Sequence, residues 1–498
     1  MIEVRMKRKE VNVLNSILLF IIPIFILIIL RSLGFDGMAG QDGYAYVDYA
    51  KNIRNWFDGG AHPGSFFWPP GYPLFGALLS YLGISIPLSM QLVSCLSLSG
   101  ILFYVQKFIN EQNEGDEVKH HDRIVFSYLL IFGVFAPYFL RAAMVTSSDM
   151  FASFWVTFSA YYFYDYSQKY RFLSLTMGVL GLCLGVLVRY PVIVALLPLA
   201  LYGIYVWIKS VRKVSHFLVL ILPVIVYFIH DLFKGGDVGF LNHHGIAEWS
   251  WKNAFASSFQ TNDGITNHTI PNIVFVFSPF FHLGYMFLGF LFVYKLFRDK
   301  KIRLPLNLLI AISYLTYAIF LAGNPDQNSR HLLIIFPYVL ILCFYGYAHF
   351  SKRMLVAKYK FWILISLIIF QALLFGRAMM PSMKRMTLEK RIVEHLNNQS
   401  TIVSSEKDST ILYSFDIDVA LKSRGIPLKS INLFNEVITT FNAGDYVLFN
   451  EDKLKLQWQG LNPMINWEFL KKNHELTLVS DFGDGWRLYL IGERVISK

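Results

Sequence analysis

The sequence is poor in charged residues and in cysteine. Only 16% of its 498 residues are Asp, Glu, Lys or Arg, whereas a soluble protein would carry about 25%. Hydrophobic residues make up 55% of the chain and occur in long runs, which predicts a polytopic membrane protein. The three cysteines, Cys95, Cys183 and Cys343, all fall inside apolar runs. They are expected to be small core residues, with no disulfide framework or metal cluster.

The net charge of +11 would suggest a nucleic-acid partner in a soluble protein. Here the Lys and Arg residues lie mainly between apolar runs, as the positive-inside rule predicts for a membrane protein, so we expect no nucleic acid. The basic N-terminus precedes a run long enough to be a retained first helix. About eleven spans are expected, at residues 11–33, 86–109, 124–140, 148–166, 172–188, 190–208, 214–232, 272–297, 304–322, 331–350 and 358–376.

The charges of the connections predict one orientation for the whole chain. With the N-terminus in the cytoplasm, every inner connection carries Lys or Arg, and the outer connections are less basic. We therefore expect a transmembrane domain over residues 1–376, with outer loops at 34–84 and 233–271, and a small outer α/β domain over 377–498. In that domain we expect helices at 387–397 and 462–472, and strands at 401–405, 445–450, 475–480 and 485–490.

Four groups of ionisable residues lie at the predicted outer ends of spans, where they are costly unless paired or functional. They are Asp42, Asp149, Arg189, and the group of Asp326, Arg330 and His331. Asp42 precedes an amphipathic helix whose apolar positions are Tyr46, Tyr49, Ala50, Ile53 and Trp56 or Phe57. Such a helix suits the bilayer surface. If the orientation holds, all four groups open on one side and could line one cavity.

Each of these residues also has a plain structural explanation. Asp42 and Asp149 could be helix caps, Arg189 could reach lipid headgroups, and Arg330 with His331 could be interfacial charges. Asp326 is expected to be a loop residue. A metal site is suggested by His243, His244 and Glu248, with Asp263 and His268 nearby, but no two-His helix signature with a third ligand is present. A solvated loop is therefore favoured there.

The order of these motifs resembles a known family. An acid follows the first span, then come Trp68-Pro69-Pro70, an acid in Ser148-Asp149-Met150, a basic hairpin from Gly185 to Pro191, and Ser329-Arg330-His331 leading a late span. Over residues 12–350 the chain resembles the GT-C glycosyltransferases, in particular the protein mannosyltransferase and aminoarabinose transferase branch. It departs from many members at two positions. The first-loop acid is Asp42 alone, preceded by Gln41, and Trp68 stands where many members have a Lys before the Pro pair.

The resemblance implies an inverting glycosyltransferase that uses a polyprenyl-phosphate sugar. Asp42 and Asp149 would be catalytic, with Asp42 as general base and Asp149 positioning the acceptor or an Arg. Arg189, Arg330 and His331 would bind the donor phosphate. The expected cavity lining is Tyr44, Tyr46, Trp68, Tyr72 and Asp326. The family also implies membrane lipid as a partner, a glycan, lipid or protein acceptor, an extracytoplasmic site in a plasma, inner or ER membrane, and in some branches a divalent cation.

A polytopic transporter or lipid flippase is the main alternative. Transporters often carry internal repeats and helices broken near the bilayer midplane. No repeat is evident, and the unusual charges gather at one predicted face, which favours an enzyme. A membrane acyl or phosphoryl transferase would require a His-Asp pair or a metal cluster, and neither is clear. A non-catalytic subunit of a glycosylation complex is a further alternative.

Overall fold

The computed structural model describes residues 2–38, 40–111, 118–234, 248–261, 264–298, 305–353, 357–398, 410–426 and 428–495. The chain forms two compact units. The first contains residues 1–37, 49–255 and 270–380, and the second contains residues 38–48, 256–269 and 381–498. The second unit therefore gathers two short segments from the predicted transmembrane part together with the C-terminal region. The domain boundary predicted at residue 377 lies inside one continuous helix, α19 (Ala357–Asn398).

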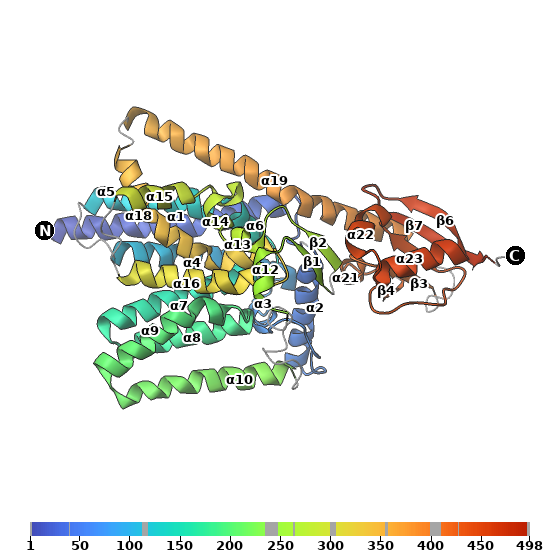
Figure 1. Ribbon diagram of the computed structural model, residues 1–498, viewed down its shortest axis with the longest axis horizontal. Coiled ribbons are helices and arrows are strands. Elements are labelled where there is room, and N and C mark those ends of the chain that lie inside the picture. Colours follow the sequence, from blue (N-terminus) through green and yellow to red (C-terminus); the bar gives the residue numbers. More distant parts are fainter. Residues whose placement is uncertain are drawn as a thin grey trace. The chain divides into compact units, whose positions relative to one another are not determined.

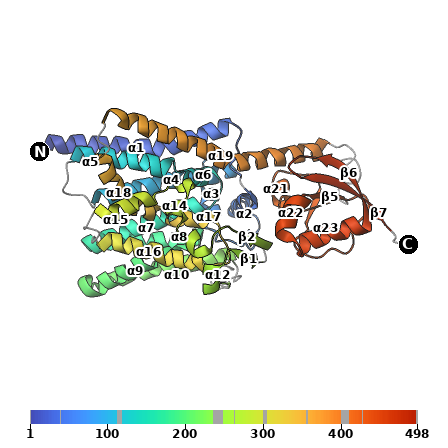
Figure 2. The same ribbon diagram turned by 45° about the horizontal axis from the view of Figure 1, so that its top comes forward.

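Helices make up the first unit, and its long helices lie side by side (Figures 1 and 2). The main ones are α1 (Ile2–Ser32), α4 (Ile86–Glu111), α7 (Asp149–Lys169), α8 (Phe172–Val188), α9 (Val192–Val206), α10 (Ile221–Lys234), α15 (Gly289–Arg298), α16 (Pro305–Ala322), α18 (Phe336–Arg353) and the first part of α19. Shorter helices lie between them: α3 (Gly71–Ser80), α5 (Val118–Tyr128), α6 (Pro137–Met144), α12 (Trp251–Phe255), α13 (Asn272–Phe275), α14 (Ser278–Phe281) and α17 (Ser329–Leu332).

Single-turn and irregular helical segments complete the first unit. They are η1 (Leu129–Val134), η2 (Trp207–Val211), η3 (Val214–Leu220), η5 (Leu283–Tyr285) and η6 (Leu333–Ile335). The turn between α9 and α10 lies at the same end as the N-terminal end of α1 (Figure 1). Both are placed in the cytoplasm by the charge pattern, so the arrangement of these helices is consistent with that prediction.

The chain is a helical polytopic membrane protein, but fewer helices meet the length and hydropathy criteria for a span than the eleven expected. Among the described residues, six helices meet them, or seven if one bent pair is a single span. The bent pair joins His121–Val134 to Pro137–Met144 at 67°, where Pro137 pushes Ala136 into an extended conformation. The predicted span at 272–297 is divided into α13, α14, η5 and α15.

Helix α7 shows why a helix at a predicted span can fail the length and hydropathy criteria. It covers the predicted span at 148–166, but it carries Asp149, Asp165 and Lys169 and is not among the helices that meet the criteria. Most of its side chains are buried against other helices, so they face protein. A helix in that position can keep polar residues that a lipid-facing helix could not. The three cysteines are buried, as expected.

A five-stranded sheet forms the centre of the second unit. Its order is β4 (Lys429–Asn432), β3 (Ile411–Ser414), β5 (Tyr446–Phe449), β7 (Arg487–Arg494) and β6 (His474–Asp481). Strand β3 pairs in parallel with β4 and β5, while β7 pairs antiparallel with β5 and β6. The unit also contains α21 (Asp418–Ser423), α22 (Glu451–Trp458), α23 (Asn462–Asn473) and a hairpin of β1 (Ser258–Thr261) with β2 (Gly264–Asn267).

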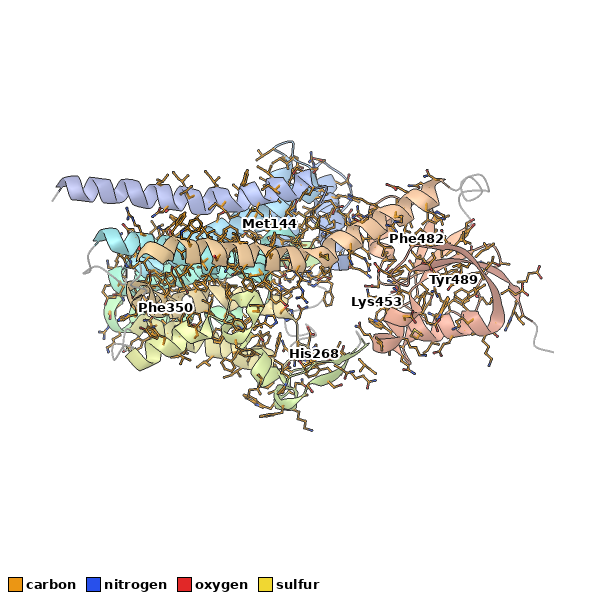
Figure 3. The ribbon with its side chains drawn as sticks, turned by 90° about the horizontal axis from the view of Figure 1, so that it is seen from above. Met144, His268, Phe350, Lys453, Phe482 and Tyr489 are labelled. Atoms are coloured by element: carbon orange, nitrogen blue, oxygen red, sulfur yellow. The ribbon has the colours of Figure 1, made fainter. Side chains whose placement is uncertain are left out.

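Alternation along the strands divides the core of this unit into two clusters. Leu412 and Leu448 pack with residues of α19 such as Ile392, whereas Tyr413 and Val447 pack in the other cluster. Successive side chains of a strand point to opposite faces, so each face of the sheet has its own core. Figure 3 labels Lys453, Phe482 and Tyr489 in this unit.

Most predicted elements of the C-terminal region are confirmed. The helices expected at 387–397 and 462–472 correspond to the end of α19 and to α23. The strands expected at 445–450, 475–480 and 485–490 correspond to β5, β6 and β7, and the last two pair with each other. The strand expected at 401–405 lies outside the described residues. Strands β3 and β4, of four residues each, were not predicted.

Candidate functional site

The candidate site in the first unit is organised around Asp149, the first residue of α7. Its side chain is 0% exposed. One carboxylate oxygen accepts a hydrogen bond from Arg189, and the other accepts from Arg330 Nε at 2.8 Å. Ser148 is the N-cap of α7 and makes no side-chain cap hydrogen bond. The explanation of Asp149 as a helix cap is therefore wrong, and its carboxylate holds two guanidinium groups together.

Polar side chains of α4 hold the turn that carries Asp149. Gln91 Nε2 donates to the carbonyl of Met144 at 2.6 Å, and Ser94 Oγ donates to the carbonyl of Ser147 at 3.0 Å. The carbonyl of Gly37 accepts from the Thr146 amide at 2.8 Å. Buried backbone groups need such partners, so this turn has a fixed path between α6 and α7. Met144, at the beginning of the turn, is labelled in Figure 3.

Arg189 reaches Asp149 from the hairpin between α8 and α9. It is the C-cap of α8, and its amide donates to the carbonyl of Gly185 at 2.8 Å. Pro191 follows two residues later as the N-cap of α9, which ends one helix and begins the next within a tight turn. The Arg189 side chain is only 12% exposed. This side chain binds Asp149 inside the protein, so the explanation that Arg189 only reaches lipid headgroups is wrong.

Arg330 is carried by a turn that three other side chains fix. Asn328 is the N-cap of α17 and accepts from the Arg330 amide at 3.1 Å. The hydroxyl groups of Tyr285 and Tyr317 donate to the carbonyls of Ser329 and His331 at 3.0 and 3.2 Å. These tyrosines are buried and hold Arg330 against Asp149. Their roles were not predicted, because a buried tyrosine in an apolar run looks like ordinary core.

At this cluster one buried carboxylate is bound by two guanidinium groups. Burying a carboxylate is costly unless cations compensate it, and here two arginines do so. The Arg330 side chain is 33% exposed, so part of its planar donor group can be reached from outside the cluster. Such an arrangement is suited to a doubly charged oxyanion, because guanidinium groups donate two parallel hydrogen bonds to phosphate.

The corner at Trp68-Pro69-Pro70-Gly71-Tyr72 packs against the same hairpin. A Cβ atom on Gly71 would lie 2.6 Å from the carbonyl oxygen of Leu187, so only glycine allows this close approach of α3 to the end of α8. The Tyr72 hydroxyl is buried, donates to the carbonyl of Met90 at 2.9 Å and lies 2.8 Å from Ser94 Oγ. Tyr72 is therefore a structural link to α4.

A lysine does reach this corner, but from a distant part of the chain. Lys234, the last residue of α10, is 5% exposed. Its ammonium group donates to the carbonyl of Phe66, and to that of Phe67 at 3.1 Å. These carbonyls immediately precede the partly buried Trp68, which occupies the position where many GT-C enzymes have a lysine. A cationic side chain is therefore present at this corner.

Asp42 lies in the first turn of α2 (Gly40–Phe57). The helix already begins at Gly40, so the suggestion that Asp42 caps it is wrong. Negative charge in the first turn is favoured by the helix dipole. Tyr44 and Tyr46 follow it and are buried. All three belong to the second unit, and the proximity of Asp42 to the arginine cluster stays a prediction.

The remaining predicted residues have more peripheral positions. His331 is half-buried and follows Arg330 directly, while Asp326 is exposed in the loop before α17. Among the described residues, no group of three or more His, Cys, Asp or Glu side chains could hold a metal ion. Of the loop suspected of metal binding, His243, His244 and Asp263 lie outside the described part of the chain.

Comparison with known proteins gives no match by sequence. No protein-family model matches the chain, and no curated protein matches it. The structure, in contrast, is similar to solved structures. One of them is ArnT from Cupriavidus metallidurans bound to undecaprenyl phosphate. Its structure matches this one with a TM-score of 0.59 and 12% sequence identity, and the match covers 94% of this chain and 97% of that chain.

Two further structures have the same architecture. ArnT from the same organism in the apo state matches with a TM-score of 0.57 and 10% identity, over 94% of this chain and 97% of that chain. The archaeal oligosaccharyltransferase AglB from Archaeoglobus fulgidus, in complex with an inhibitory peptide and a dolichol-phosphate, matches with a TM-score of 0.51 and 11% identity, over 98% of this chain and 74% of that chain. Both proteins are GT-C glycosyltransferases, and the chain described here has a GT-C-like fold.

Proposed function

We propose that this protein is an inverting glycosyltransferase that moves a hexose or pentose from a polyprenyl-phosphate donor to an acceptor. The observation that carries the proposal is the cluster in which Asp149 joins Arg189 and Arg330. Such a cluster offers positive charge to a phosphate within a membrane protein of GT-C-like fold. The structural neighbours support this class, since one is bound to undecaprenyl phosphate and another to a dolichol-phosphate.

In this proposal the two arginines receive the donor phosphate. As the bond between the anomeric carbon and the phosphate oxygen breaks, that oxygen gains negative charge, and fixed guanidinium groups stabilise it. A phosphate monoester anion leaves without being protonated, so no general acid is required. Asp149 acts as a positioning residue, since both of its oxygens are occupied by the arginines in this structure. Lys234 and His331 are further sources of positive charge for the donor.

Asp42 is proposed to be the general base. The acceptor hydroxyl or amine attacks the anomeric carbon, its proton passes to the Asp42 carboxylate, and the polyprenyl phosphate departs with the bonding electrons. A single displacement of this kind inverts the anomeric configuration. We place this reaction on the outer face of the membrane, with a cytoplasmic N-terminus, on the basis of the positive-inside pattern. The candidate residues for the part of the cavity that binds the acceptor are Trp68, Tyr46 and Asp326.

The test is transfer by the purified protein in lipid nanodiscs, with a panel of undecaprenyl-phosphate hexoses and pentoses as donors. Asp42→Asn should fold and bind donor, but transfer should fall by ~10²-fold or more, as for loss of a general base. Asp58→Asn is the matched control, because Asp58 follows the same helix and contacts Tyr81 and Arg54. Transfer at the wild-type rate by Asp42→Asn would remove Asp42 from the mechanism.

Solute transport distinguishes the main alternative. Sealed vesicles that contain the protein should not accumulate sugar or lipid unless glycosyl transfer takes place. Transport without any sugar transfer in the same vesicles would support a transporter or flippase and contradict the proposal.

A further inference from the structure

The second unit contains its own buried carboxylate, and it binds the helix that carries Asp42. Glu389 lies in the last part of α19, and its side chain is 2% exposed. It accepts from Arg385 Nε at 2.9 Å, and from both Nε and Nη2 of Arg424 at 3.2 Å. It also accepts from the hydroxyl of Tyr44, which is 345 residues earlier in the chain. A carboxylate with this many donors is strongly held.

Tyr44 is held from both sides. Its hydroxyl donates to Glu389 and accepts from Arg424 Nη2, so both its donor and its acceptor capacity are used. The Arg424 guanidinium also lies over the tyrosine ring, with Cζ 5.3 Å from the ring centroid. The phenol is 2% exposed. These contacts fix the ring in position and direction.

A second contact holds the same helix one turn further on. Ser423 Oγ donates to Asp48 Oδ1 at 3.0 Å, and Asp48 follows Tyr44 by four residues, so both side chains lie on one face of α2. Ser423 and Arg424 are adjacent at the end of α21. Two contacts one turn apart fix the rotation of a helix about its axis as well as its position.

The network is anchored within the second unit. Arg385 donates to the carbonyl oxygen of Asp416, and to its carboxylate at 3.2 Å. Lys453, labelled in Figure 3, pairs with the same carboxylate. Asp416 has a φ of +65°, a conformation that Asp tolerates in turns, and it lies two residues before the start of α21. Glu389 and Asp416 together therefore balance most of the charge of the cations around them.

We infer that Tyr44, Glu389 and Arg424 are positioning residues for Asp42. Asp42 lies two residues before Tyr44 on α2, and each residue turns the helix by about 100°, so the rotation fixed at Tyr44 determines where the Asp42 carboxylate points. A general base must lie within hydrogen-bond reach of the proton that it removes. The C-terminal region thus takes part in the reaction by aligning the base. This inference rests on the proposed function, in which Asp42 is the base.

The test compares Tyr44→Phe with Tyr413→Phe in the full-length protein. Both variants lose one buried tyrosine hydroxyl of the second unit, but Tyr413 on β3 packs in the core of the sheet and makes none of the network contacts described above. We expect Tyr44→Phe to lower kcat about tenfold with an unchanged KM for the undecaprenyl-phosphate sugar, because donor binding is separate from base alignment. The kcat of Tyr413→Phe should stay at the wild-type value.

Two further readouts separate positioning from general destabilisation. Amide hydrogen exchange in residues 40–48 should be faster in Tyr44→Phe and unchanged in Tyr413→Phe. The effects of Tyr44→Phe and Glu389→Gln on kcat should also be non-additive, since the first removes and the second weakens the same hydrogen bond. Equal losses of kcat in Tyr44→Phe and Tyr413→Phe, or strictly additive effects, would overturn the inference.

The outcome of Asp42→Asn distinguishes the failure of this inference from that of the proposed function. An inactive Asp42→Asn together with a fully active Tyr44→Phe would overturn the positioning role alone. A fully active Asp42→Asn would overturn both the general base and the role of the network that aligns it.

Discussion

Two buried carboxylates, one in each unit, are each held by two arginines, and the two clusters differ in the exposure of their arginines and in the further contacts that Arg385 makes. Around Asp149 the ion pairs are those with Arg189 and Arg330. Around Glu389, Arg385 continues to a second carboxylate, Asp416. Both acids are almost fully buried, but the Arg330 side chain is 33% exposed, against 14% for Arg424. The first cluster therefore suits an incoming anion, and the second suits the fixing of a neighbouring helix.

A buried ion pair does not by itself indicate its role. Such pairs often add little net stability, because desolvation offsets the attraction between the charges. What separates the two clusters is the greater exposure of the Arg330 side chain and the second carboxylate that Arg385 binds. Predictions that disturb the two clusters differently therefore test whether their roles differ.

The largest effect is expected for Asp149→Asn. The neutral amide removes the buried charge that pairs with two guanidinium groups, which should cost ~3–5 kcal/mol of stability and reduce transfer by ~10²-fold or more. The measurements are thermal unfolding in nanodiscs and initial transfer rates. Asp165→Asn is the matched control, since Asp165 is on the same helix and bonds Lys169 and Ser174. Equal losses of transfer in both variants would show that Asp149 has no special role.

A smaller effect is expected for Gly71→Ala. The new methyl group would meet the carbonyl of Leu187, so α3 must move away from the end of α8, directly before Arg189. Overpacking of this kind costs ~1–3 kcal/mol, and the displaced arginine should weaken transfer. Gly376→Ala in α19 is the control, because a Cβ atom there has no neighbour within 4 Å. If the two variants unfold at the same temperature, the close approach at Gly71 is not required.

The smallest effect concerns a third buried carboxylate, Asp418 at the start of α21. It accepts from Asn432 at 2.8 Å, and burial raises its pKa above the usual value. A raised pKa in the folded state favours the protonated form, so this group's contribution to stability is present at low pH and is lost as pH rises through that pKa. Because asparagine does not titrate, Asp418→Asn should not show this loss of stability as pH rises.

The measurement for Asp418 is unfolding of the full-length protein followed by tryptophan fluorescence between pH 4 and pH 7. The difference in stability between wild type and Asp418→Asn should change with pH in favour of the variant as pH rises. A difference that stays constant over this range, or that changes in the opposite direction, would show that Asp418 does not titrate as its burial suggests.

Much of the fold could be predicted from the sequence, because long apolar runs and basic connections have strong periodic and compositional signals. The pattern also identified Asp149, Arg189 and Arg330, since a charge at the end of an apolar run is conspicuous. It could not indicate that Asp149 binds both arginines, because their contact joins residues 40 and 181 positions apart. The breaks in the predicted span at 272–297 were missed because apolar residues dominate it, although Pro279, His282 and Gly284 interrupt the run.

The supporting residues were beyond sequence analysis for a physical reason. Gln91 and Ser94 look like tolerated polar residues of an apolar helix, and Tyr285 and Tyr317 look like core aromatics. Their function depends on which backbone carbonyl each hydroxyl or amide reaches, and that is decided by packing. Tyr44 was expected to line a cavity, but its partners Glu389 and Arg424 come from the C-terminal region, 345 and 380 positions further along the chain.

The most direct test is binding of undecaprenyl phosphate, without a sugar, to the purified protein in nanodiscs. We expect Arg330→Gln and Arg189→Gln each to weaken binding by about tenfold or more, since each removes a charge-assisted contact to the phosphate. Arg54→Gln should bind like wild type, because Arg54 instead donates to the carbonyl and hydroxyl of Ser80. Wild-type affinity in both cluster variants would contradict the central claim that this arginine pair receives the lipid phosphate.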